Sequence, residues 1–108
     1  MDGENIMGTS SNLYTGQPAA TATTLVTSPA STVTKITYAE AYNTGAAVET
    51  LDLFFGSTQI AKGVTLGPHE TVTLFPFLGA VLDAADTLDA TASTATTINV
   101  KIDGYQVT

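Results

Sequence analysis

The chain of 108 residues contains no cysteine, no tryptophan and no arginine. The absence of cysteine excludes thiol catalysis, thiolate metal sites and disulfide bonds. The absence of tryptophan weakens an assignment to the sugar-binding modules, because sugars are commonly held against exposed aromatic planes. His69 is the single histidine, which excludes a metal site built from several histidines. The chemistry that remains is that of hydroxyl, carboxylate and apolar side chains.

Basic residues are also scarce, with three lysines facing ten acidic residues and a formal net charge of -7. The resulting electrostatic field repels phosphate backbones and anionic lipids, and no apolar run approaches the length of a membrane span. We therefore expect no nucleic-acid partner and no membrane partner. The charge favours a neutral or basic protein surface as partner, although many soluble proteins are acidic without any specific partner.

Threonine, valine and isoleucine give the chain the β-branched bias of strands, and helix-forming residues are few. The sequence predicts an all-β fold, an antiparallel β-sandwich that is either a jelly roll or immunoglobulin-like, with an extended N-terminal arm. Residues 1–12 are expected to form this flexible arm and residues 13–108 a single domain. The predicted strands cover residues 23–27, 32–42, 48–55, 58–61, 70–75, 87–93 and 98–107.

Alternation predicts which side chains of the two longest central strands face the core. In the first, VTKITYAEAY, the face expected to point inward carries Thr34, Ile36, Tyr38, Glu40 and Tyr42. In the second, Leu51, Leu53 and Phe55 are expected to point inward, which leaves Phe54 as an apolar residue on an otherwise polar face. Phe54 is therefore a candidate contact residue.

The two strands that end the chain alternate as well, despite their Thr/Ala-rich texture. Their inward residues are expected to be Leu88, Ala90 and Ala92, followed by Ile98, Val100 and Ile102. Strict alternation beyond Ile102 would leave Tyr105 and Val107 in water. We therefore predict a β-bulge at Asp103–Gly104, where glycine can adopt a left-handed conformation.

The breaks between strands are predicted at several places. Turns are expected at Asn43–Gly45, Leu66–Glu70 and Asp83–Asp86, and Gly63 is expected to end a short strand. The segment from Phe75 to Ala85 has no clean period. It is expected to cover one end of the sandwich with apolar side chains such as Phe77, with one helical turn over residues 80–85 as the alternative.

No constellation of residues indicates a reaction. His69 lies between Pro68 and Glu70, where an exposed turn histidine is the expected role. The carboxylates of Asp83, Asp86 and Asp89 lack the spacing and the glycine of an EF-hand, and are expected to be solvated. No nucleophile elbow or phosphate-binding glycine loop occurs. We therefore predict no catalytic residue, no metal and no cofactor.

The strand and turn cues are KITYAEAYNTGAAVETLDLFFG, LGPHETVTL, LDAADTLDATAST and TTINVKIDGYQVT. In this order they resemble the small virion proteins of tailed bacteriophages over residues 23–108. Such proteins look like capsid decoration (cement) proteins, or accessory parts of the tail and neck. The resemblance implies a non-enzymatic structural subunit on the capsid surface that binds the major capsid protein lattice and stabilises the head, as a homo-oligomer, either a trimer or a dimer.

The candidate contact residues for such a partner are Ile6, Met7, Tyr14, Phe54 and Phe77. Ile6 and Met7 are isolated apolar residues in the polar arm, which is expected either to order on a neighbouring subunit or to be a frayed terminus. The competing class is a host-surface module that binds glycans, in which Tyr14, Tyr42 or Phe54 would form an exposed platform.

Overall fold

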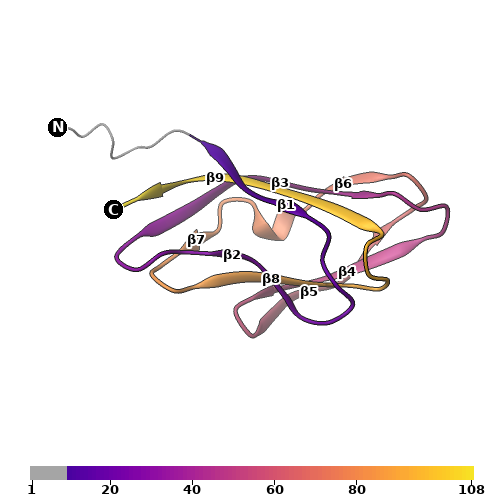
Figure 1. Ribbon diagram of the computed structural model, residues 1–108, viewed down its shortest axis with the longest axis horizontal. Helices are drawn as coiled ribbons and strands as arrows, with labels where there is room; N and C mark the ends of the chain where they lie inside the picture. The colour runs from indigo at the N-terminus through magenta and orange to yellow at the C-terminus, as the bar shows by residue number, and fades with distance from the viewer. Residues whose placement is uncertain (1–9) are drawn as a thin grey trace.

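The computed structural model describes residues 10–108, which form two antiparallel sheets packed face to face (Figure 1). The predicted all-β sandwich is confirmed. No helix within these residues is long and apolar enough to cross a membrane. The elements are β1 (Ser11–Gly16), β2 (Thr23–Thr27), β3 (Val33–Asn43), β4 (Glu49–Phe55), β5 (Thr58–Leu66), β6 (Thr71–Thr73), the 3-10 turn η1 (Phe75–Phe77), β7 (Val81–Leu82), β8 (Thr87–Ala92) and β9 (Ile98–Val107).

Strands that follow one another in the chain mostly belong to different sheets. One sheet has the order β1-β9-β3-β6, with the short β7 also paired to β3, and the other has the order β2-β8-β4-β5. Only β4 and β5 are joined as neighbours by a hairpin, while most other connections cross from one sheet to the other. The two sheets are therefore interlocked by the chain path, and the core lies between them.

The predicted inward faces of β8 and the first half of β9 are confirmed. Leu88, Ala90 and Ala92 are buried, and Ile98, Val100 and Ile102 are buried beside them. The predicted strand at residues 23–27 and the inward position of Leu51 and Leu53 on β4 are confirmed as well. Period-two alternation in β4, β8 and the first half of β9 thus reports burial correctly, even where the inward residues are alanines.

The predicted inward face of β3 is correct only up to Ile36. The register of β3 against β9 shifts between Ile36 and Tyr38, so Thr37 is an extra residue in the strand. After this β-bulge the buried residues are Ala39, Ala41 and Asn43. Tyr38, Glu40 and Tyr42 consequently lie on the outer face, and Tyr38 is 40% exposed. One inserted residue exchanges the two faces of a strand, which is why the predicted aromatic face is on the wrong side.

The predicted bulge at Asp103–Gly104 is therefore on the wrong strand. Alternation on β9 continues through Gly104, which is buried opposite Ile36, and Gly104 does not have a positive φ. Tyr105 and Val107 are nevertheless half-buried. The need for glycine is steric, since a Cβ at this position would overlap the carbonyl oxygen of Lys35 and lie 2.8 Å from Cδ1 of Leu13.

The predicted end of a strand at Gly63 is also corrected, because β5 continues through it to Leu66. The register against β4 shifts here, so that Lys62 and Gly63 together lie opposite Asp52. Gly63 has a φ of 67°, and its N–H donates to Oδ1 of Asp52 over 2.8 Å. Glycine at this position makes a bulge, since it adopts the left-handed conformation at little cost.

The segment between β6 and β8 covers the core as predicted, with Leu74, Phe77 and Leu82 fully buried. Its helical turn is η1 at Phe75–Phe77, where Pro76 fits the first turn, and the alternative turn at residues 80–85 is wrong. Residues 81 and 82 instead form β7. The predicted turn at Asp83–Asp86 is confirmed: the Asp86 N–H donates to the Asp83 carbonyl, and the Asp83 N–H donates to Oδ2 of Asp86.

The first strand begins two residues before the predicted start of the domain. Ser11 and Asn12, assigned from sequence to the arm, pair in β1 with Gly104 and Asp103 of β9. The Asn12 side chain also donates to Oδ1 of Asp103 over 3.2 Å. The domain within the described residues therefore starts at Ser11.

Candidate functional site

The predicted contact residues do not form one surface. Ile6 and Met7 lie outside the described residues. Phe77 is 0% exposed and has no surface for a partner, so it belongs to the core. Tyr14 on β1 is half-buried against the core, and burial raises the pKa of its hydroxyl. Phe54 on the opposite sheet is the one member of this set that lines a surface hollow.

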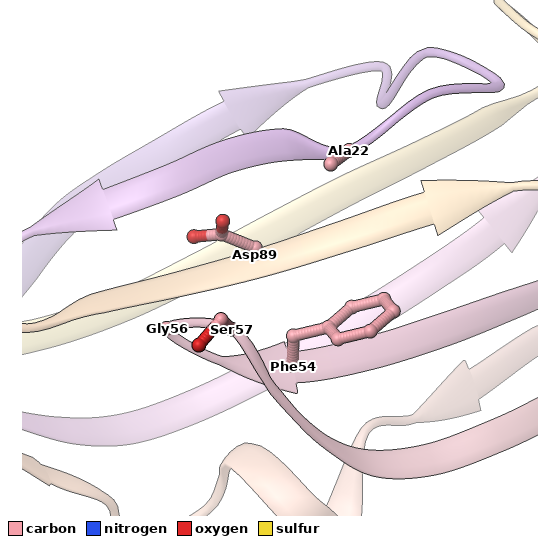
Figure 2. A pocket seen from close by; sticks show the side chains of 5 residues that line it. All are labelled: Ala22, Phe54, Gly56, Ser57 and Asp89. Carbon is pink, nitrogen blue, oxygen red and sulfur yellow. The ribbon is translucent and has the colours of Figure 1, made fainter.

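The hollow lies on the outer face of the β2-β8-β4-β5 sheet and has a volume of about 340 Å³. Figure 2 shows its lining, with Asp89 on β8, Phe54 near the end of β4, Gly56 and Ser57 in the turn after β4, and Ala22 just before β2. Segments that are far apart in the sequence thus converge on one site.

Strand pairing fixes the positions of these side chains. Asp89 is paired with Phe54 on one side and with Thr24 on the other, so the centre of the hollow is the middle strand β8. Directly paired side chains on one face of a sheet lie next to each other. One end is closed by the two-residue hairpin loop Gly56–Ser57, in which Gly56 has the positive φ of 62° that such a loop requires.

The Asp89 carboxyl group is the unusual feature of the hollow. Its Oδ1 atom is enclosed and accepts no hydrogen bond. None of the hydrogen bonds formed among residues 10–108 reaches its other oxygen either, and no basic residue lines the hollow. Enclosed polar atoms in proteins are usually hydrogen-bonded, and a carboxylate without a donor loses solvation without compensation. Asp89 is therefore an acceptor group that the domain itself leaves unmatched.

The other carboxylate on this outer face is matched. Asp52 accepts the Gly63 N–H and lies 3.8 Å from Nζ of Lys62, whose side chain is 79% exposed. Asp52 thus has a hydrogen-bond donor and a nearby cation, whereas Asp89 has neither among the described residues. It also provides a reference carboxylate on the same strand as Phe54.

Charged and aromatic groups on the outer face of the other sheet partner one another. Nζ of Lys101 lies 2.5 Å from Oδ2 of Asp103 and 5.6 Å from the centre of the Tyr38 ring. The hydrogen bond from Lys101, supported by one from Asn12, holds the pKa of Asp103 below its ordinary value. The Tyr38 hydroxyl donates to Glu40, which raises the pKa of the tyrosine. These charged and aromatic groups are thus paired with one another.

Exposed apolar side chains form a second surface feature of the domain. The sequence pattern did not distinguish these residues from core residues. Phe75 is 73% exposed and Val81 is 46% exposed, and both belong to the segment that runs along β3 beside β6. Phe75 and Phe77 are two residues apart, so alternation would give them the same environment. The η1 turn instead buries one and exposes the other. No sequence signal distinguishes them.

The predicted exposed turn histidine is confirmed. His69 is exposed, with a φ of 56°, and its Nδ1 lies 3.5 Å from the Tyr42 hydroxyl. Within residues 10–108, no group of three or more histidine or acidic side chains is close enough to hold a metal ion. Comparisons of the sequence with protein families and with curated proteins find no match.

Proposed function

We propose that this protein is a non-enzymatic structural subunit of a tailed-phage virion, a capsid decoration or cement protein that binds the major capsid protein lattice. The observation that carries this proposal is the order of strands in the two sheets. β1-β9-β3-β6 facing β2-β8-β4-β5, with the short β7 added beside β3, is the arrangement expected of an eight-stranded jelly roll with crossing connections. An immunoglobulin-like domain would instead hold its first two strands in one sheet, whereas β1 and β2 lie in different sheets here.

Jelly rolls occur in viral capsid proteins, lectins and cupins, so the fold is compatible with a structural or binding role. The sequence resemblance over residues 23–108 favours the virion among these. A decoration protein needs a rigid scaffold and exposed groups that grip a lattice. The interlocked sheets form a rigid scaffold of this kind. The exposed side chains of Phe75 and Val81 are candidates for the contact with the lattice.

Assembly into a trimer or dimer would strengthen lattice binding. Each copy in an oligomer can make a modest contact, because the linked copies bind with a raised effective concentration. The acidic net charge of -7 favours a neutral or basic surface on the capsid.

Three measurements test the proposal. Light scattering of the purified protein should give the mass of a dimer or trimer, and the protein should co-sediment with expanded capsids to a fixed stoichiometry and raise their melting temperature. A monomer that fails to bind capsids would contradict it.

A second candidate function is glycan binding by a tail, neck or host-surface module. The observation in its favour is the hollow in which an aromatic ring, Phe54, lies beside a carboxylate, Asp89, and a hydroxyl, Ser57. A glycan panel tests it, and a hit that Phe54→Ala abolishes would favour this function over lattice binding.

A further inference from the structure

We propose that the hollow beside Asp89 receives a lysine side chain of the protein partner, with the ammonium group bound at the Asp89 carboxylate. The inference rests on the proposed function in one respect, namely that the partner is a protein surface. It adds the chemical identity of one contact and the residues that make it.

The carboxylate supplies the first argument. Asp89 lies on the middle strand of the three that surround the hollow, and its enclosed Oδ1 has no donor. A cation brought to the open side of the carboxyl group would offset the negative charge shared by both oxygens. Charge-assisted hydrogen bonds of this kind are stronger than those between neutral groups. A bound ammonium would thus supply the cation that offsets the charge of Asp89, which no basic residue of the hollow does.

The apolar lining supplies the second argument. Figure 2 shows the Asp89 carboxyl group on the side of β8 that faces β2, at the same end of the hollow as Gly56 and Ser57, and the Phe54 ring extending the other way along β4. A long side chain with an apolar stem and a charged head suits this layout. The stem of a lysine can lie against Phe54 while its head reaches the carboxylate.

Arginine and sugars fit the same hollow less well. A guanidinium binds a carboxylate best through two parallel hydrogen bonds, but Oδ1 of Asp89 is enclosed and only one oxygen faces outward. A sugar ring carries hydroxyl groups around its rim, whereas the polar side chains of the lining are only Asp89 and Ser57. The net charge of -7 favours a cation further.

The test uses the purified 108-residue protein and N-acetyl-lysine methylamide as the probe, followed by the shifts of backbone amide signals in NMR spectra. We expect saturable shifts at Phe54, Ser57 and Asp89. In Asp89→Asn, which keeps the side-chain volume, the dissociation constant should rise by about tenfold or more. The matched control is Asp52→Asn, which removes the same charge from the same outer face and should bind the probe as the wild type does.

Three further probes decide the chemistry of the site. N-acetyl-norleucine methylamide keeps the apolar stem without the charge, and it should give no saturable shift. The arginine analogue should bind more weakly than the lysine probe. The inference is overturned if norleucine binds as well as lysine, if methyl glycosides bind in place of lysine, or if none of the probes shifts these signals.

Capsid co-sedimentation separates this inference from the proposed function. Reduced capsid retention of Asp89→Asn, with Asp52→Asn unaffected, supports both. If Asp89→Asn binds capsids as tightly as the wild type, the inference fails and the proposed function stands. If the wild type ignores capsids but binds the lysine probe, the lysine site stands and the proposed function fails.

Discussion

Gly104 on β9 faces the carbonyl oxygen of Lys35 on β3 so closely that any side chain at this position would overlap it. The contact lies beside the β3 bulge, where the register shifts between Ile36 and Tyr38. The close approach of the two strands and the extra residue on β3 belong to the same local distortion. Glycine is required here for space, with no demand for a left-handed conformation.

Gly104→Ala is therefore expected to destabilise the fold. The overlap involves backbone atoms, which cannot move aside as a flexible side chain can, and overpacking typically costs about 1–3 kcal/mol. The melting temperature followed by circular dichroism should fall by at least several degrees. Gly45→Ala is the control, because a Cβ there would meet only Oδ1 of Asn43 at an ordinary 3.5 Å. Equal melting temperatures for the two variants would contradict the steric account.

Asn43→Ala should also destabilise the protein strongly. The buried Asn43 side chain donates to the carbonyl oxygens of Ala47, Leu66 and Gly67 and accepts the Gly45 N–H, and it thereby joins two loops. Removing it leaves several polar groups without partners, at a cost of about 2 kcal/mol or more. Urea unfolding measures the loss. Asn99→Ala removes an exposed side chain whose one hydrogen bond within residues 10–108 is with Gln17, and it should change stability by less than about 0.5 kcal/mol.

Substitution of the two phenylalanines of the η1 turn should change the stability of the fold to very different extents. Phe77→Ala empties a fully buried site and should cost about 3–5 kcal/mol of stability. Phe75→Ser removes an exposed ring and should leave the melting temperature nearly unchanged, while lowering co-sedimentation with capsids if this residue contacts the lattice. Unchanged capsid binding by a folded Phe75→Ser protein would remove Phe75 from the proposed interface.

The ion pair of Lys101 and Asp103 predicts a dependence of stability on pH. Because the pKa of Asp103 is lowered in the folded state, its contribution is complete above the unfolded value of about 4 and is lost as the pH falls through the folded value. Carboxyl NMR titration should give Asp103 a pKa below the ordinary value, and Lys101→Gln should raise it. Added salt should weaken the effect, since the pair is partly exposed. A pKa that Lys101→Gln does not change would contradict the assigned cause.

Alternation in the sequence was sufficient for β4, β8 and most of β9, because their inward faces keep one phase along their length or along the part that packs. It failed in β3, where the extra Thr37 reverses the phase and the aromatic residues look like the natural inner face. The glycine signal was read correctly as a distortion but assigned to the wrong strand. A bulge belongs to a pair of strands, and the pairing of β3 with β9 is not visible in either strand alone.

Of the two residues that characterise the hollow, the sequence predicted Phe54 as a contact residue but did not single out Asp89. Phe54 was identified because an apolar residue stood on a polar face of its own strand. Asp89 resembled any solvated carboxylate, since its surroundings come from β2, β4 and the Gly56–Ser57 turn. Its lack of a donor depends on which strands flank β8, and that is a property of the tertiary fold. The η1 turn buries Phe77 and exposes Phe75, and no pattern in the local sequence predicts which of the two is buried.

The bulge at Lys62 and Gly63 changes the free edge of its sheet. β5 is the last strand of its sheet, and an unbroken outer edge there could recruit the same strand of another molecule and grow into a ribbon. The bulge breaks the regular spacing of that edge, and the exposed Lys62 places a charge beside it. The bulge at Gly63 and the charge of Lys62 thus disfavour pairing of this edge with another copy of the chain.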